Sequence, residues 1–276
     1  MKSIRSRDNP FYKELAKLSG SVRQRNKSGQ TLLDGAHLLD AYLDSGNRPQ
    51  HILLNTAALR DAEIAGLMQR MQGVPVTLLD YSLFAELSEL KTPTGILALI
   101  DIPGRPQGES RAYDSTLSPS DMQVAQSRLA LLLEDIQDPG NLGSMLRSAA
   151  AAGCDAVYLS QGCADAWSPR VLRAAMGGHF ALDIHEHADL ADIAARFDGA
   201  TYGATLQANE SLYGHDYAGN VAFAFGNEGA GLSRELVEAV HHAILIPMSG
   251  KVESLNAAAA AAVCLFEAAR QRGWKS

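Results

Sequence analysis

A helix start and an arginine in the second half of the chain have residue types that suit an anionic ligand. Asn141 opens a helix expected over 141–152, directly after an apolar segment at 129–134. Four apolar residues recur at the helical spacing i, i+3, i+4 and i+7: Leu142, Met145, Leu146 and Ala149. Arg147 lies off this core-facing stripe. A helix amino terminus beside an arginine suits a phosphate or a developing negative charge, although a capping Asn141 and a surface Arg147 would give the same pattern.

A glycine-rich segment with one acid follows the apolar segment 221–225. Gly226 to Gly231 holds three glycines in six residues, which lets the backbone turn sharply and approach a ligand closely. It matches neither the dinucleotide-binding GxGxxG pattern nor the P-loop. Glu228 could bind a ligand hydroxyl or a cation. The alternative is a tight loop that only turns the chain.

Polar residues also open the last expected helix, over 253–272. Ile246, Pro247 and Met248 end an apolar segment, and Ser254 and Asn256 flank Leu255 shortly afterwards. Ser254 could simply cap the helix. Together with Asn256, however, it could face the same loop as Gly226.

The elements around these segments predict an α/β protein. Beyond residue 128 we expect a parallel sheet with strands at 129–134, 156–159, 180–184, 201–205, 221–225 and 243–246. Helices are expected between them at 141–152, 168–176, 190–197 and 233–240, with the last at 253–272. Ligands of such sheets bind at the carboxyl ends of the strands, where all three polar segments fall.

The first hundred residues predict a smaller α/β unit, and residues 103–127 differ from both halves. Strands are expected at 31–35, 51–54, 74–79 and 95–102, with helices starting at Pro10 and at 36–45, 62–71 and 81–87. Residues 103–127 show no apolar periodicity and predict a linker. The expected domains are therefore 1–102 and 128–276, joined by that linker.

The distribution of charge is uneven along the chain. The formal net charge is −7, yet residues 1–30 carry eight basic against two acidic side chains, which leaves −13 for the rest. A basic arm on an acidic body could contact nucleic-acid phosphates, and a solvated helix is the alternative. No apolar stretch could span a bilayer and no signal segment opens the chain, so a cytoplasmic location is expected. The cysteines and histidines show neither disulfide nor metal-ligand spacing, so no metal is expected.

In their order and spacing, the three polar segments resemble the signature motifs of the SpoU/TrmH family of RNA ribose 2′-O-methyltransferases, in the SPOUT superfamily. The resemblance covers residues 129–272. It implies a parallel sheet whose carboxyl-terminal part forms a trefoil knot, a homodimer, and S-adenosylmethionine bound in the knot. The cofactor positions that carry over are at the ends of expected strands and at the last helix: Thr205, Gly226, Ile246, Met248 and Leu255.

The resemblance also implies the reaction, which is methyl transfer to a ribose 2′-hydroxyl of RNA. Asn141, Glu228, Ser254 and Asn256 would orient the ribose and the loops. Arg147 would act as a base or as a cation that binds phosphate; because arginine keeps its proton under ordinary conditions, we favour the cation. The amino-terminal third is similar to the family's ribosomal-protein-like RNA-binding module, on Asn9-Pro10, the basic stretch and residues 33–35.

Three functional hypotheses remain open at this stage. The favoured one is a methyltransferase of ribosomal RNA, with transfer RNA as the alternative target. The second is a non-catalytic RNA-binding protein of the same fold, against which the presence of Asn141, Arg147, Glu228 and Asn256 argues. The third is a nucleotide-dependent dehydrogenase, which the missing GxGxxG pattern disfavours.

Overall fold

The structure, a computed structural model, describes residues 2–103 and 128–273, which fall into two compact units. The described residues of the first unit are 2–103 and 167–180, and those of the second are 128–166 and 181–273. The linker expected over 103–127 lies almost wholly outside the described residues. Among the described helices, none has the length and apolar character needed to cross a membrane.

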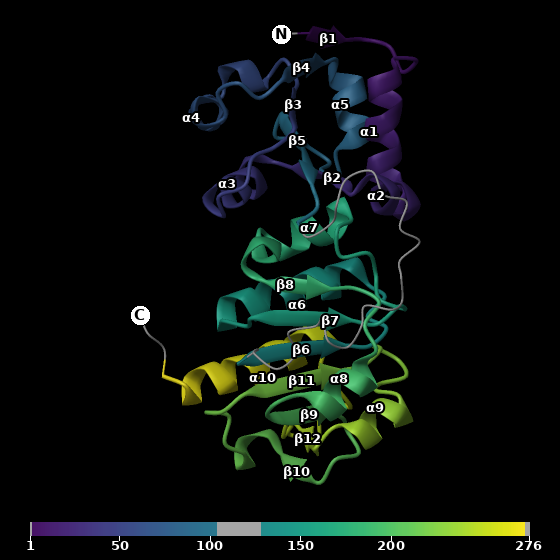
Figure 1. Ribbon diagram of the computed structural model, residues 1–276, viewed down its shortest axis with the longest axis vertical. Coiled ribbons are helices and arrows are strands. Elements are labelled where there is room, and N and C mark those ends of the chain that lie inside the picture. Colours follow the sequence, from purple (N-terminus) through teal and green to yellow (C-terminus); the bar gives the residue numbers. More distant parts are fainter. Residues whose placement is uncertain (1, 104–127, 274–276) are drawn as a thin grey trace. The chain divides into compact units, whose positions relative to one another are not determined.

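The second unit is built on a parallel sheet, as the sequence predicts. Its described strands run in the spatial order β10-β12-β9-β11-β6-β7-β8, and every pairing is parallel (Figure 1). The strands are β6 (Leu129–Leu133), β7 (Ala156–Leu159), β8 (Asp183–His185), β9 (Ala200–Ala204), β10 (Glu210–Ser211), β11 (Val221–Phe225) and β12 (His242–Leu245). Every residue of β6 and β11 is buried, because helices cover both faces of the sheet.

Helices cover the two faces of this sheet in pairs. The helices of this unit are α6 (Pro139–Ala152), α8 (Leu190–Arg196), α9 (Arg234–Ala239) and α10 (Ala257–Gln271), with a 3-10 turn η4 (Leu212–Gly214). Leu190 and Ile193 of α8 and Leu236 of α9 belong to one buried cluster with Ala130 and Leu132 of β6. Helices α6 and α10 pack against each other, and α10 also packs on β11. The stripe predicted for α6 is buried and Arg147 is exposed, which confirms that prediction.

The first unit is a mixed sheet covered by helices. Its spatial order is β1-β4-β3-β5-β2, with β5 antiparallel to both neighbours. The strands are β1 (Lys2–Ile4), β2 (Gln30–Asp34), β3 (His51–Leu54), β4 (Val76–Leu79) and β5 (Ile96–Asp101). The helices are α1 (Pro10–Gly20), α2 (Val22–Ser28), α3 (Ala36–Asp44), η1 (Ala58–Arg60), α4 (Ala62–Arg70), α5 (Tyr81–Leu87) and α7 (Pro169–Ala175). Strand β1 and helix α2 were not predicted, since β1 has three residues and α2 is almost wholly polar.

The segment 167–180 packs with the first unit, although sequence order assigns it to the second. Thr31 Oγ1 donates a hydrogen bond to the Trp167 carbonyl at 2.7 Å, and the rings of Tyr42 and Phe180 lie 5.1 Å apart. Gly177 is required here, since a Cβ on it would lie 2.6 Å from that of Ala41. A prediction made from chain order alone cannot show that a segment within the second half of the sequence packs in the first unit.

The strand expected over 180–184 is wrong in its bounds. Residues Gly178–Ala181 form a 3-10 turn, η3, and the strand β8 begins at Asp183. Met176 and Gly177 adopt left-handed backbone conformations, with φ of 49° and 89°. They end α7 and redirect the chain, so pairing with β7 starts only where Asp183 meets Ala156.

Part of the basic arm is used within the first unit. Arg25 is 3% exposed and donates to the Ser19 carbonyl at 3.1 Å, and Lys13 pairs with Asp8 at 2.9 Å. Arg7 forms an ion pair with Glu86. Fewer free cations are therefore available for phosphate than the sequence count suggests.

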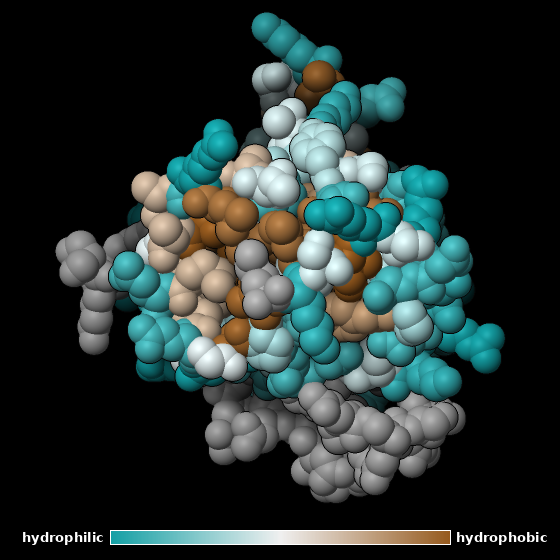
Figure 2. All heavy atoms as spheres, turned by 90° about the horizontal axis from the view of Figure 1, so that it is seen from above, coloured by the Kyte–Doolittle hydropathy of each residue, from teal (hydrophilic) through white to brown (hydrophobic). Residues whose placement is uncertain are grey.

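Figure 2 looks onto the end where Figure 1 labels β1, β4 and α5. It shows hydrophobic residues gathered near the middle of a hydrophilic face.

Candidate active site

Four neighbouring strands of the second unit end at one edge of the sheet. Strands β12, β9, β11 and β6 are adjacent and parallel, so the loops that follow them lie side by side. From β6 the chain proceeds to β7 on one side, and from β11 it proceeds to β12 on the other. Such a switch point is where open α/β sheets bind ligands. The three polar segments therefore meet, as the sequence predicts, and residues 205–208 join them.

A chain of hydrogen bonds links the three segments through side chains. Asn256 Nδ2 donates to Asn141 Oδ1 at 2.9 Å, and Asn141 Nδ2 donates to Glu228 Oε1 at 2.9 Å. Asn256 Oδ1 accepts from the backbone N–H groups of Ala258 and Ala259, which fixes the direction of its amide. Asn141 must then present its oxygen to Asn256 and its nitrogen to Glu228. The carboxylate of Glu228 ends this chain and keeps further acceptor capacity for a ligand hydroxyl.

The caps of the two helices differ from expectation. Asp138, not Asn141, caps α6 by accepting from the Asn141 N–H at 2.7 Å. Asn256, not Ser254, caps α10, which starts at Ala257 rather than at residue 253. Because Asp138 satisfies the helix start, the Asn141 side chain is released to join the site. Ser254 lies in an exposed segment before the cap.

The glycine loop is held in place by a residue that the sequence analysis did not single out. Asn227 Oδ1 accepts from the Gly229 and Ala230 N–H groups at 2.9 and 3.0 Å, and its Nδ2 donates to the Asp135 carbonyl at 2.9 Å. A Cβ on Gly226 would lie 2.1 Å from the backbone carbonyl of Gly231. Gly226 therefore has no room for a side chain. An asparagine inside a glycine-rich loop is the signal that could have identified Asn227.

A cavity of about 480 Å³ opens at this edge of the sheet. All five residues that the resemblance assigns to the cofactor line it: Thr205, Gly226, Ile246, Met248 and Leu255. Glu228 and Ser254 also lie on its wall. Residues 206–208 line it too, and only their place after β9 could have indicated them. Its volume lies within the range of about 300–1,000 Å³ that is typical of small-molecule sites.

Arg147 lies apart from the cavity wall. It is exposed on α6, six residues after Asn141, which is about 9 Å along a helix axis. Among the described residues its guanidinium makes no ion pair or hydrogen bond, so it can bind an anionic ligand without breaking internal contacts. Asn141 and Asn256 also lie outside the lining of the cavity, where they support Glu228.

Comparison with known proteins identifies the family. The model of the SpoU rRNA methylase family matches residues 128–266, and the MRM3-like substrate-binding domain matches residues 9–98. The chain belongs to the SpoU rRNA methylase family. The resemblance inferred from the three motifs is thereby confirmed, as is the α/β fold with a parallel sheet.

Relatives of this SpoU family member match it along nearly its whole length. An uncharacterized tRNA/rRNA methyltransferase of Synechocystis is 33% identical, over 98% of this chain and 94% of its own. The 23S rRNA (guanosine(2553)-2′-O)-methyltransferase RlmP of Bacillus subtilis is 31% identical, over 96% and 98%. A crystal structure of an RNA 2′-O ribose methyltransferase has 30% identity and a TM-score of 0.78, with 98% and 99% covered. An AdoMet-bound rRNA methyltransferase of Sinorhizobium meliloti has 25% identity and a TM-score of 0.78, with 98% and 97% covered.

Proposed function

We propose that the protein methylates a ribose 2′-hydroxyl of ribosomal RNA, with S-adenosylmethionine as the methyl donor. The observation that carries the proposal is the hydrogen-bond chain from Asn256 through Asn141 to Glu228, at the mouth of the 480 Å³ cavity. A surface that only binds RNA would have no need to hold the carboxylate of Glu228, which lines this cavity, in a fixed direction. The family's relatives that are named as rRNA methyltransferases support the substrate class.

The cavity suits S-adenosylmethionine in size and in lining. Gly226 and Ile246 offer backbone groups near strand ends, where an adenine edge could be hydrogen-bonded. Met248 and Leu255 supply apolar surface for the adenosine rings, and Thr205 follows β9, the strand between β11 and β12. Glu228 supplies a carboxylate for a hydroxyl or for a positively charged group. We assign the cofactor to this wall.

The protein's own contribution to the reaction is position and charge. When bound, S-adenosylmethionine would supply an electrophilic methyl group for the ribose 2′-oxygen, with S-adenosylhomocysteine as the leaving group and the hydroxyl proton passing to solvent. Glu228, held by Asn141, would orient the ribose at the cavity mouth. Arg147 would bind the adjacent phosphate and stabilise the developing negative charge on the oxygen. Ser254 would contact the ribose from the exposed segment before α10.

We further propose that the protein acts as a homodimer with a knotted carboxyl-terminal region. Tyr213 and Phe266, which are 57% and 38% exposed, and Leu206, which is 59% exposed, give the second unit apolar surface that a partner could cover. The loops that would form the knot carry Gly226, Ile246 and Leu255, all of which line the cavity. Sedimentation of the full chain tests the dimer, and a monomer at micromolar concentration would contradict it.

Transfer of labelled methyl groups tests the activity. Ribosomal and transfer RNA from a strain that lacks the protein are incubated with it and with labelled S-adenosylmethionine. We expect label in ribosomal RNA at one nucleotide, and resistance of the following phosphodiester to alkali, because a methylated 2′-oxygen cannot attack it. Label in transfer RNA alone would show that the substrate is transfer RNA instead of ribosomal RNA. Absence of label in both would favour a non-catalytic RNA-binding protein.

Calorimetric titration with S-adenosylmethionine and with NAD tests the cofactor separately from the RNA. Binding of S-adenosylmethionine that is lost in Gly226→Ala would support the cavity assignment. Binding of NAD in its place would contradict it and would favour dehydrogenase chemistry.

A further inference from the structure

A carboxylate and two imidazoles meet at the edge of the second unit's sheet, and none of the three residues lines the cavity. Glu210 opens β10, His215 follows the 3-10 turn η4, and His242 opens β12. Glu210 Oε2 lies 3.2 Å from His215 Nε2 and 3.4 Å from His242 Nδ1. In the part of the chain that the structure describes, no other three His, Cys, Asp or Glu residues bring their ligand atoms within 4.8 Å of one another. We propose that these three residues bind a divalent transition-metal ion of the zinc type.

The two distances from the carboxylate oxygen to the imidazole nitrogens are close to those of tetrahedral coordination, and the two nitrogens lie within 4.8 Å of each other. Zinc binds histidine nitrogen and carboxylate oxygen at about 2.0–2.2 Å, so two ligand atoms at the tetrahedral angle lie about 3.3–3.6 Å apart. The two distances from Glu210 Oε2, 3.2 and 3.4 Å, match this separation. Because the side chains of Glu210 and His242 are at least partly exposed, rotation of these side chains can bring the three ligand atoms to one centre. Two nitrogens and one oxygen are typical ligands of zinc and its first-row neighbours, and not of magnesium or calcium.

The register of the sheet holds Glu210 and His242 on one face. Glu210 pairs with Ile244, so it points to the same face as Ile244 and as His242, two residues earlier. His242 pairs with Tyr202 on the next strand, and their rings are stacked, 5.1 Å apart at 19°. Tyr202 is buried and therefore limits the rotation of the imidazole. The two ligands are thus positioned before any ion binds.

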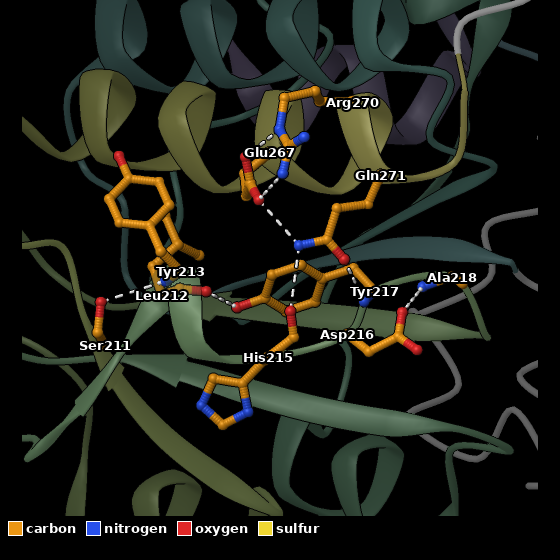
Figure 3. Close-up of polar contacts among 10 residues, drawn as sticks. All are labelled: Ser211, Leu212, Tyr213, His215, Asp216, Tyr217, Ala218, Glu267, Arg270 and Gln271. Carbon is orange, nitrogen blue, oxygen red and sulfur yellow. Dashed lines mark hydrogen bonds and ion pairs between the residues drawn. The ribbon is translucent and has the colours of Figure 1, made fainter.

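A side chain of helix α10 holds the backbone of the third ligand, His215. Gln271 Nε2 donates to the His215 carbonyl at 3.1 Å, and Gln271 Oε1 accepts from the Tyr217 N–H at 2.8 Å. The buried Tyr217 hydroxyl donates to the Leu212 carbonyl at 2.6 Å, which closes the loop on the other side of His215. Figure 3 shows these bonds and shows the His215 imidazole pointing away from α10. A loop fixed at both ends gives its ligand a defined direction.

Exposure of the cluster leaves one coordination position for solvent. The side chain of His215 is 15% exposed, that of His242 is 41% exposed, and that of Glu210 is 56% exposed. The site would therefore carry a water molecule as its fourth ligand. His242 begins β12, whereas residues 243–246 of that strand and the following loop line the cavity. The ion would tie β10 to β12 and so stiffen the cavity-wall segment 205–208, which leads into β10.

Zinc titration of the full-length protein, freed of metal by a chelator, tests the site without reference to methylation. Wild type should bind one equivalent of zinc, and cobalt in its place should give the strong visible absorption of a tetrahedral site. His215→Ala and Glu210→Gln should lower zinc affinity by more than the roughly 10–100-fold that the loss of an outer-shell partner costs. Glutamine has nearly the same shape as glutamate, and residue 210 is exposed, so the Glu210→Gln variant should fold as wild type does.

His185→Ala is the matched control. His185 is stacked on Tyr158, 4.8 Å apart at 10°, and pairs with Asp183 at 3.1 Å, as His242 does with Tyr202 and Glu210. It lacks a third ligand among the described residues. The control should bind zinc as wild type does, and zinc should raise the melting temperature of both. Absence of saturable binding in wild type, or equal binding in Glu210→Gln and His215→Ala, would overturn the proposal.

Discussion

Replacement of Gly226 by alanine is the sharpest test of the cavity, because the structure leaves no room there for one carbon atom. A Cβ at this position would lie 2.1 Å from the carbonyl carbon and oxygen of Gly231 and 2.3 Å from the nitrogen of Leu232. Ordinary contacts begin at 3.4 Å, so more than 1 Å of backbone movement is needed. The obstacles are main-chain atoms, which cannot rotate out of the way as a side chain would.

The backbone around the obstacle is itself held by hydrogen bonds. The Gly231 N–H donates to the Asn227 carbonyl at 2.9 Å, and Asn227 accepts two further N–H groups of the loop. Opening the loop would cost about 1–3 kcal/mol of overpacking and about 0.5–1.5 kcal/mol for each hydrogen bond lost. With two bonds lost, we expect Gly226→Ala to lower the free energy of unfolding by about 2–6 kcal/mol, or to displace the loop and abolish cofactor binding.

Urea unfolding and calorimetric titration with S-adenosylmethionine measure both outcomes. Gly219→Ala is the control, since a Cβ there meets nothing within 4 Å and its backbone is not left-handed. The control should stay within about 0.5 kcal/mol of wild type or be slightly more stable. Wild-type stability together with wild-type cofactor affinity in Gly226→Ala would refute the close packing on which the site is built.

Three further predictions concern side chains. Arg147→Ala should lower the single-turnover rate by about 10²–10³-fold and leave the free energy of unfolding within about 0.5 kcal/mol of wild type. Arg234→Ala, an exposed control, should change neither quantity. Full activity of Arg147→Ala would exclude Arg147 from the reaction. Lys17→Ala with Arg23→Ala, both exposed, should reduce the salt slope of RNA binding by about 1–2 in a filter-binding assay, and an unchanged slope would contradict a phosphate role. Hydrogen bonds from Arg270 and Gln271 lower the pKa of Glu267 to about 2. The ionised carboxylate therefore stabilises the folded state above about pH 4.5, and this contribution is lost as the pH falls toward 2. Glu267→Gln should therefore be less stable than wild type at neutral pH, and a difference that persists at pH 2 in thermal unfolding would be inconsistent with this linkage.

The Lys17→Ala and Arg23→Ala variants are a better test than a truncated protein of whether the first unit supplies the RNA affinity. The +6 segment suggests that the first hundred residues supply RNA affinity and the rest supplies cofactor binding. Removing residues 1–100 would also strip the segment 167–180 of its packing partners, among them Thr31 and Tyr42. Loss of RNA binding after truncation would then have two causes. Single exposed cations avoid this ambiguity.

The elements with strong periodicity could be predicted from the sequence. Helix α6 has its apolar stripe and its left-handed Gly153, and strands β6 and β11 are continuous apolar runs. Their order along the chain predicts a parallel sheet, and a parallel sheet predicts that polar residues after its strands meet at one edge. For this reason the sequence predicts that the three segments form one site.

The features that could not be predicted depend on contacts across the chain. Ser254 and Asn256 are both good capping residues, and only the position of α6 shows why Asn256 is used: its amide must also reach Asn141. The cluster of Glu210, His215 and His242 joins strands β10 and β12, whose pairing no local pattern reveals. Sequence spacing finds ligands that lie close along the chain, and it has no means to find those that a sheet register brings together.

The hydrogen-bond chain explains why three segments so far apart in sequence must act as one unit. Asn141 has one amide oxygen and one amide nitrogen, and each is engaged by a different segment. Loss of Asn256 would leave the Asn141 oxygen without this donor, and Asn141 could then rotate away from Glu228. A carboxylate without that support would lose its fixed direction at the cavity mouth, even though its charge is unchanged. The cap of α10 therefore supports the geometry of Glu228, and the proposed cofactor site and the proposed ribose site share this structural element.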